Sequence, residues 1–219
     1  CDIAPHASRR VGWYRFEAPS GTRALQMALE AESARAWVNG QPVAIQHGRI
    51  ELPEPLEGVG QVALRLEQRP GCYAGAAFKE PVEFACERTS MPLGDWSDFA
   101  LQSYSGGAVY RREFVLGAAH LDCEIVLDLG QVQVSAEVEV NGQKVGVGLA
   151  RPYCFDIADY VREGRNQVVV RVFNTMANHY SVAFPSSYVF PGQTVSGLLG
   201  PVEVRFSARV NMRATLLQC

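Results

Sequence analysis

One hairpin-like sequence occurs twice in this chain of 219 residues, and it constrains the fold more than any other feature. Residues 136–148 read AEVEVNGQKVGVG, and residues 34–46 read ARAWVNGQPVAIQ. In each copy apolar and polar residues alternate up to an Asn-Gly pair, which is typical of a half-buried strand. Asn and Gly tolerate the positive φ angles of a type I′ turn, whose twist matches the flanking strands. We therefore predict two β-hairpins, with the Asn-Gly pairs 39–40 and 141–142 at their tips.

The repetition extends on both sides of the hairpin. Three further pairs of segments match in the same order: 13–19 with 110–116, 61–66 with 167–172, and 80–84 with 200–204. The interval between partners widens from about 98 to about 120 residues, so the second copy has longer loops, mostly between residues 174 and 200. Solenoid repeats are shorter, at roughly 20–50 residues. We therefore expect two tandem domains of one fold, a shorter one at 10–86 and a second at 94–208.

The rest of the chain also favours strands. Short alternating runs are interrupted by Gly, Pro and Asn about every ten residues, which is the pattern of an all-β sandwich. Only residues 56–60 and 157–164 could hold a turn or two of helix. The sequence predicts an all-β chain made of tandem antiparallel β-sandwiches, with helix below about 10%.

Composition narrows the classes of partner. The chain has 20 Lys and Arg against 23 Asp and Glu, a net charge of −3 and no basic block. There is thus no electrostatic reason to expect nucleic acid or an anionic membrane surface. No apolar run approaches the roughly 20 residues that a membrane helix needs. We expect neither a nucleic-acid partner nor a membrane span.

The cysteines and the ends of the chain leave alternatives open. Cys1 would suit the start of a lipid-anchored protein, but we prefer to interpret Cys1 and Cys219 as cut points in a longer protein. The four internal cysteines could form two disulfides, but we prefer unpaired core thiols, with Cys123 and Cys154 acting as small apolar residues in strand-like stretches. Free thiols favour a cytoplasmic location slightly, with secretion or a lipid anchor as alternatives.

No catalytic, metal or cofactor site is apparent in the sequence. The four histidines have no second His or Cys at metal-ligand spacing,. The serines lack a nucleophile elbow, and no Gly-rich segment precedes a helix to hold a phosphate. Asp95 and Asp98 lie close together, but on a loop leading into a strand such residues are more often turn-formers or solvated charges. We predict no catalytic residue, no metal and no cofactor.

Six short motifs across residues 95–206 carry a resemblance to a known family. In order they are Y-S-G-x-A-x-Y, L-D-L-G, V-N-G-x-x-x-G, P-[YF]-x-x-D-I, G-x-N and S-G-[LI]-x-G-P-V. In these motifs the second domain resembles the galactose-binding-like jelly-roll modules of glycoside hydrolases, notably those of family 2 enzymes and family 106 α-L-rhamnosidases. The first domain shares the resemblance only through the internal repeat. The resemblance implies an accessory role, because the catalytic carboxylates of such enzymes lie in a separate (β/α)₈ barrel.

Modules of this kind bind sugars with exposed aromatic rings and with polar groups that contact hydroxyls. Candidates lie at the entry of the second domain and on its long loop: Trp96, Tyr104, Tyr110, Asn178, His179, Tyr180, Tyr188 and Phe190. We expect Asn178, His179 and Tyr180 to contact carbohydrate or a partner domain, with Tyr104 and Trp96 as neighbours. The alternative is that the entry aromatics fill the sandwich and that the loop packs on a partner domain.

Trp37 distinguishes the first hairpin from the second. It shares the polar face of its strand with Arg35, at the position where the second copy has Glu139. An exposed Trp usually marks a contact. The contact could be a glycan, but we prefer a domain or subunit interface.

Two classes of function remain. The first is a non-catalytic β-sandwich region of a bacterial glycoside hydrolase, supporting or docking on a catalytic barrel of the same polypeptide and contacting carbohydrate. The alternative is a stand-alone carbohydrate-binding or cell-surface adhesion protein. A complete enzyme is disfavoured, because nothing resembles the strand-helix units of a barrel.

Overall fold

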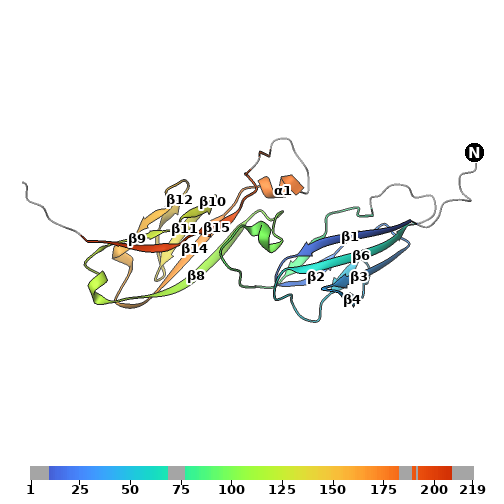
Figure 1. Cartoon of the computed structure of the whole chain (residues 1–219), viewed down its shortest axis with the longest axis horizontal. Coiled ribbons are helices and arrows are strands. Elements are labelled where there is room, and N and C mark those ends of the chain that lie inside the picture. Colours follow the sequence, from blue (N-terminus) through green and yellow to red (C-terminus); the bar gives the residue numbers. More distant parts are fainter. Residues whose placement is uncertain (1–9, 69–76, 183–188, 191, 209–219) are drawn as a thin grey trace, which may run out of the picture. The chain divides into compact units, whose positions relative to one another are not determined.

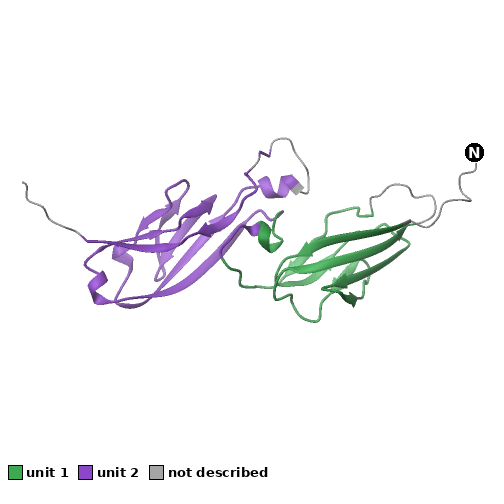
Figure 2. Ribbon diagram, in the orientation of Figure 1, with its two compact units in different colours: residues 1–92, 97–102 green, residues 93–96, 103–219 purple. Residues whose placement is uncertain are grey.

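The computed structural model describes residues 10–68, 77–182, 189–190 and 192–208 (Figure 1). Strands make up 52% and helices 8% of these described residues, so the expectation of an all-β chain with little helix is confirmed. The chain divides into two compact units. Unit 1 consists of Cys1–Pro92 and Ser97–Gln102, and unit 2 of Leu93–Trp96 and Ser103–Cys219 (Figure 2).

Unit 1 contains two antiparallel sheets. Its strands are β1 (Arg10–Ala18), β2 (Thr22–Gln26), β3 (Ser33–Val38), β4 (Gln41–Val43), β5 (Arg49–Glu51), β6 (Gly60–Gln68) and β7 (Glu83–Cys86). One sheet has the strand order β1-β6-β3-β4, and the other has the order β5-β2-β7.

The two sheets of unit 1 share one apolar core. On β6, Val62, Leu64 and Leu66 are buried, while the residues between them face outward to varying degrees. They belong to the same buried cluster as Leu25 of β2 and Ile50 of β5. The alternation therefore places one face of each sheet in the core and leaves the other face toward solvent.

Unit 2 has more elements than unit 1. Its strands are β8 (Gly107–Leu116), β9 (Glu124–Asp128), β10 (Gln131–Gln133), β11 (Ser135–Val140), β12 (Gln143–Gly148), β13 (Cys154–Asp156), β14 (Gly164–Phe173), β15 (Gly197–Gly200) and β16 (Glu203–Ser207). Its helical elements are η3 (Ala118–His120), η4 (Ala158–Tyr160) and α1 (Ala177–Val182). The helix η2 (Trp96–Phe99) has its first residue, Trp96, in unit 2 and its remaining residues in unit 1. No helix in the described ranges is long and apolar enough to cross a membrane.

The strand order of unit 2 repeats that of unit 1. The sheet β12-β11-β14-β8 corresponds to β4-β3-β6-β1, and the sheet β13-β9-β16 corresponds to β5-β2-β7. The matching segments 61–66 and 167–172 fall on the corresponding strands β6 and β14. The repetition in the sequence is therefore a repetition of the sandwich, as predicted.

Both Asn-Gly pairs lie at hairpin tips. Val38 pairs with Gln41 across the first turn, and Val140 pairs with Gln143 across the second. The two asparagines have φ angles of 50° and 51°, and the glycines that follow them have 78° and 81°. Positive φ at both central residues is what a type I′ turn requires. The hairpin prediction is confirmed in both copies.

Each of these asparagines also ties its hairpin to the neighbouring strand. Asn39 accepts a hydrogen bond from the Gln61 N–H at 2.8 Å, and Asn141 accepts one from the Gln167 N–H at 3.0 Å. In unit 2 the Asn141 amide donates in addition to the side chain of buried Asn166, at 2.8 Å. The Asn-Gly motif thus joins its hairpin to the neighbouring strand in both units, and Asn141 makes more side-chain hydrogen bonds than Asn39.

The elements β10, β15 and α1 have no counterpart among the described strands and helices of unit 1. β15 pairs with β10, and α1 and β15 both come from the long connection between residues 174 and 200, where the insertion was expected. Residues 178–180 belong to α1, so treating them as a loop was wrong. Of the two segments expected to hold helical turns, 157–164 contains η4 and 56–60 contains none.

The described cysteines are free, but their positions differ from the expectation. Cys86, Cys123 and Cys154 are free thiols; Cys86 and Cys154 are exposed and Cys123 is half-buried. Placing Cys123 and Cys154 in the core was therefore wrong. β13 buries Phe155 and so turns its neighbour Cys154 outward. Cys72 lies outside the described residues.

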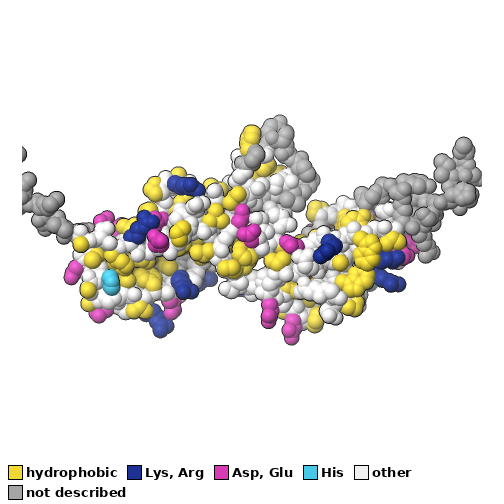
Figure 3. Space-filling model, viewed as in Figure 1, with side chains coloured by type: hydrophobic (Ala, Val, Ile, Leu, Met, Phe, Trp, Pro, Cys, Tyr) yellow, Lys and Arg dark blue, Asp and Glu magenta, His cyan; other side chains and the backbone are white. Residues whose placement is uncertain are grey.

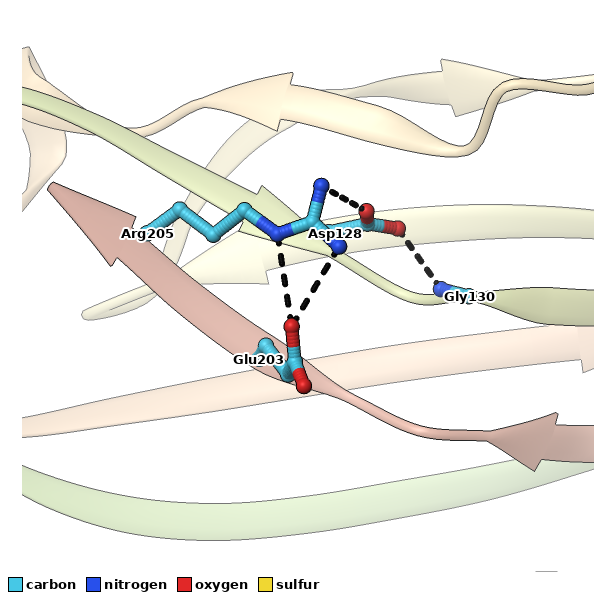
Figure 4. Close-up of polar contacts among 4 residues, drawn as sticks. All are labelled: Asp128, Gly130, Glu203 and Arg205. Atoms are coloured by element: carbon cyan, nitrogen blue, oxygen red, sulfur yellow. Dashed lines mark hydrogen bonds and ion pairs between the residues drawn. The ribbon is translucent and has the colours of Figure 1, made fainter. Parts of the chain in front are cut away.

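Asp128 organises a polar group on the sheet formed by β13, β9 and β16 (Figure 4). One carboxylate oxygen accepts the Gly130 N–H and the other contacts Arg205 Nη1, both at 2.8 Å, while Arg205 also contacts Glu203 at 3.3 Å. Desolvation of the sulfur, followed by the charge and hydrogen bonding of Asp128, raises the pKa of Cys154; Arg205 acts in the opposite direction. This direction disfavours the thiolate, which is the nucleophilic form of cysteine,.

Candidate functional site

The short helix α1 depends on its surroundings for stability. It has six residues, and isolated helices of that length do not form in water,. The Thr175 hydroxyl accepts the Ala177 N–H at 3.2 Å, in the manner of an N-cap,. The backbone N–H of His179 donates to the Ser105 hydroxyl at 3.1 Å. Contacts with the rest of unit 2, more than helix propensity, therefore hold α1 in place.

Asn174 joins this helix to the segment that precedes β8. Its side-chain oxygen Oδ1 accepts the Gly106 N–H at 2.8 Å, and its side-chain amide donates to the Tyr104 carbonyl at 2.8 Å. The same amide lies 3.1 Å from Asn178 Oδ1 and 3.0 Å from the Ser196 hydroxyl. One side chain thus connects three segments that are far apart in the sequence.

Asn178 and Ser196 form the buried part of this network, with exposed fractions of 1% and 0%. The Ser196 hydroxyl donates to Asn178 Oδ1 at 3.0 Å, and the Asn178 amide donates to the Thr194 carbonyl at 2.7 Å. Both ends of the Asn178 carboxamide therefore have partners inside unit 2. We assign Asn178 a positioning role, which leaves its neighbours on α1 to make any contact.

Trp96 is buried as well, with an exposed fraction of 1%. Its indole N–H donates to the Tyr110 hydroxyl at 2.9 Å, and that hydroxyl also accepts the Leu198 N–H at 3.2 Å. The Trp96 ring packs against the Tyr104 ring, with centroids 5.5 Å apart. Trp96 therefore fills the sandwich and supports Tyr104, as the alternative interpretation of the entry aromatics proposed.

Four side chains form the surface around this network, and we name them the α1 edge: Tyr104, Phe173, His179 and Tyr180. Tyr104 and Phe173 are each 40% exposed, and Tyr180 is 48% exposed. His179 is half-buried, and its ring meets that of Tyr180 edge to face at 5.5 Å. The α1 edge therefore presents aromatic rings, Tyr hydroxyls and an imidazole on segments that the Asn174 network joins.

Two glycines allow the rings of the α1 edge to lie close to the backbone. A Cβ at Gly106 would lie 2.6 Å from the Tyr104 hydroxyl, and a Cβ at Gly107 would lie 2.7 Å from the Phe173 ring. Real Cβ atoms do not approach other atoms this closely, so the rings could not keep these positions over a larger residue. The pair Gly106-Gly107 therefore leaves room for the rings of Tyr104 and Phe173 at the start of β8.

The structure places the sequence-predicted residues in two groups. Tyr104, His179 and Tyr180 lie at the surface, whereas Asn178 and Trp96 lie beneath them. Phe190 is 64% exposed, and Tyr188 lies outside the described residues. The role of the surface residues in binding stays a prediction.

Sequence analysis assigned no role of its own to Asn174 or Ser196 and missed Phe173. The spacing of Asn174 and Asn178 offered a signal, because side chains four residues apart can meet on one side of a helical turn. Ser196 stands in the S-G-[LI]-x-G-P-V motif, but the motif does not indicate its contact with Asn178. Phe173 gave no signal, since its ring position depends on Gly107, which is distant in the sequence. A buried hub of this kind is visible only once the fold brings its members together.

The α1 edge offers groups for binding and no pair of carboxylates for catalysis. Asp95 accepts the Ser196 N–H at 3.4 Å, which fits a structural role in its turn. Over the part of the chain that the structure describes, no group of three or more His, Cys, Asp or Glu residues could hold a metal ion. Glycoside hydrolysis needs two carboxyl groups roughly 5–9.5 Å apart beside the scissile bond. The edge can stack on a flat apolar face and exchange hydrogen bonds.

Trp37 lies in unit 1, on the outer face of the four-stranded sheet. Its ring stacks on that of Trp13 from β1, with centroids 5.6 Å apart and an angle of 27° between the planes. Trp13 is 62% exposed, and Trp37 is half-buried beneath this contact. The sequence singled out Trp37 alone, because the stack depends on two strands that pair through β6.

Comparison with known families identifies the family to which the second sandwich is similar. Residues 77–189, slightly more than half of the chain, match the family described as glycosyl hydrolases family 2, sugar binding domain. The chain belongs to this family. The match runs from β7 to beyond α1, so the α1 edge of this family 2 sugar-binding domain lies within it.

Individual relatives match smaller parts of their own length. A putative β-glucuronidase of Formosa agariphila is 34% identical over 91 residues, covering 39% of this chain and 8% of that protein. A rhamnosidase structure from Novosphingobium sp. PP1Y is 22% identical, covers 88% of this chain and 22% of that one, and has a TM-score of 0.45. A β-glucuronidase structure from Ruminococcus gnavus is 31% identical, covers 33% and 13%, and has a TM-score of 0.32. The chain thus spans between 8% and 22% of the length of these relatives.

Proposed function

We propose that this chain is the non-catalytic β-sandwich region of a bacterial glycoside hydrolase. It docks on a separate catalytic barrel of the same polypeptide, and its α1 edge is the surface that contacts the barrel and carbohydrate. Membership of the family 2 sugar-binding domains supports the accessory role. The greater length of the matched relatives is consistent with a catalytic part that lies outside this chain.

The observation that carries this proposal is the fixed presentation of exposed aromatic rings at the α1 edge. Tyr104, Phe173 and Tyr180 are each at least 40% exposed, yet the backbone beneath them is fixed by the Asn174, Asn178 and Ser196 network. Exposed aromatic clusters mark contact surfaces. Binding groups keep their geometry best when a second layer of hydrogen bonds holds them.

The chemistry of the α1 edge suits both proposed contacts. The faces of Tyr104 and Tyr180 can stack on the C–H face of a pyranose or on an apolar side chain of the barrel. The Tyr180 hydroxyl can exchange hydrogen bonds with sugar hydroxyls or with polar groups of the barrel, and the Tyr104 hydroxyl, which donates to the Gly107 carbonyl at 3.0 Å, can accept one,. No charge has to be buried for either contact, since the α1 edge includes no Asp, Glu, Lys or Arg.

A double variant tests the proposal. His179→Ala/Tyr180→Ala should weaken binding of the purified catalytic barrel, or of its monosaccharide products, by about tenfold or more, as removal of aromatic anchors does at other interfaces. The matched control is His120→Ala/Phe206→Ala, which removes another His–aromatic pair of unit 2, with ring centroids 4.7 Å apart. The control should bind like the wild type. Calorimetric titration gives the affinities, and circular dichroism verifies the fold.

Equal affinities for the wild type and for His179→Ala/Tyr180→Ala would remove the α1 edge from consideration. Equal losses in both double variants would mean that the effect is not specific to this surface. Either result would overturn the assignment of the site, while the family membership of the chain would stand.

A further inference from the structure

The outer face of the four-stranded sheet in unit 1 carries aromatic and cationic groups in a regular pattern. Two adjacent rows cross β1, β6 and β3, and they are Trp13–Arg65–Arg35 and Arg15–Ala63–Trp37. We name these six residues the tryptophan–arginine face. Figure 3 shows hydrophobic side chains over this part of unit 1 with Lys and Arg side chains beside them.

The two tryptophans form a platform on this face. Trp13 and Trp37 come from strands on either side of β6, and Ala63 is the small residue that the register places beside Trp37. A small residue at that position leaves room for the two rings to stack. With 62% of Trp13 exposed, the stack presents aromatic surface to solvent.

The guanidinium groups give this platform a positive charge. Arg65 pairs with Glu67 of its own strand. Arg15 and Arg35 are exposed, and neither has an ion pair or a hydrogen bond with any other residue that the structure describes. Neither row contains a carboxylate. Two unpaired cations therefore stand next to an exposed aromatic stack.

Unit 2 provides an internal reference for this face, because it repeats the same sheet. Its residues at the positions of Arg35 and Trp37 are Glu137 and Glu139. There Arg171 contacts the carboxylate of Glu139 at 3.1 Å. The second copy thus has two carboxylates at these positions, whereas the first copy has Arg35 and Trp37 there. The carboxylates of the first copy, Glu67 and Glu17, lie in the flanking rows.

We propose that the tryptophan–arginine face binds a saccharide that carries uronic acid groups. A pyranose ring stacks on the exposed indole of Trp13, and its carboxylate pairs with Arg15 of the same strand. Arg35 lies on the other side of the Trp13–Trp37 stack and pairs with the carboxylate of a second uronic acid residue. Aromatic faces bind the C–H face of a sugar ring, and a guanidinium binds a carboxylate through two parallel hydrogen bonds.

A protein partner fits this face less well. Each partner of a stable protein interface buries about 800 Å². Here the apolar surface is confined largely to two indoles, and three guanidinium groups lie among them. The face also lies outside the matched residues 77–189. This inference and the proposed role of the α1 edge can therefore fail independently.

The test compares an oligogalacturonide with the same oligomer after methyl esterification, which removes the charge and keeps the sugar backbone. Calorimetric titration of the full chain should show binding of the acid form, weakened by about tenfold or more on esterification because the charge-assisted bonds are lost. Trp13→Ala, Arg15→Ala and Trp37→Glu should each weaken binding by a similar factor. Trp37→Glu introduces the residue of the second copy.

Matched controls separate binding from folding. Arg111→Ala removes the arginine that unit 2 has at the position of Arg15, and it should leave the affinity unchanged. Trp13→Phe keeps an aromatic ring and should retain more affinity than Trp13→Ala. Circular dichroism verifies that each variant is folded.

Several outcomes would overturn the inference. These are the absence of binding at millimolar oligomer, equal affinity for the esterified form, or full affinity in Trp13→Ala. Equal or tighter binding of sulfated dextran or single-stranded DNA would show a general polyanion surface. Loss of barrel docking in Trp37→Glu, without any oligogalacturonide binding by the wild type, would assign the face to a protein partner.

Discussion

Replacing Asn178 by Ala tests whether a buried polar network holds the α1 edge. The change removes the donor to the Thr194 carbonyl at 2.7 Å, and the acceptor for Asn174 at 3.1 Å and for Ser196 at 3.0 Å. Each partner keeps another bond: Ser196 still reaches Thr194 at 3.2 Å, and Asn174 still reaches the Tyr104 carbonyl at 2.8 Å. Three lost hydrogen bonds at about 1 kcal/mol each, softened by these remaining bonds, predict a loss of about 2–3 kcal/mol in the free energy of unfolding.

Calorimetry measures this loss, because the chain has two units that need not unfold together,. For a unit of this size we expect the Tm of unit 2 to fall by about 10 °C. Amide hydrogen exchange should increase in residues 174–182. The control is Met176→Ala, which removes a side chain that is 54% exposed in the same segment and should change stability by less than about 0.5 kcal/mol,. If Asn178→Ala were as stable as this control, the network would not be what holds α1.

Three further predictions concern other parts of the chain. Because partial desolvation of the sulfur and then the Asp128 carboxylate raise the pKa of the exposed Cys154, Asp128→Asn should lower that pKa and speed alkylation of Cys154 at mildly alkaline pH; an unchanged rate by mass spectrometry would refute this,. Asn141→Gly should destabilise its unit by about 2 kcal/mol more than Asn39→Gly does, since both keep the turn but only Asn141 also bonds Tyr160 and Asn166; equal losses in urea would contradict it,. The isolated chain should not hydrolyse aryl-glycosides above background, and turnover abolished by replacing one of its acids would reveal a missed site.

The parts of the fold that local pattern determines could be predicted from the sequence. The Asn-Gly pairs have the φ angles that their turn type requires, whatever surrounds them,. The alternation along β6 and β11 follows the two-residue period of a strand,. The tandem sandwich followed from the repeat, because similar segments in the same order along the chain adopt the same fold.

The candidate site could be predicted only in part, because its geometry depends on distant segments. The sequence grouped Asn178, His179 and Tyr180 as one contact surface, but the fold buries Asn178 and leaves Tyr180 exposed. A six-residue helix gives too few residues for a periodic signal,. The stack of Trp13 on Trp37 likewise arises from strands that meet through β6.

The central claim is that the family 2 sugar-binding domain docks on a catalytic barrel through its α1 edge. The most direct measurement is amide hydrogen exchange of the chain alone and in the presence of that barrel. Docking at the α1 edge predicts slower exchange in residues 103–107 and 174–182, with β9 and β16 unchanged. Protection confined to β9 and β16, or to unit 1, with residues 174–182 exchanging as in the free chain, would contradict the claim.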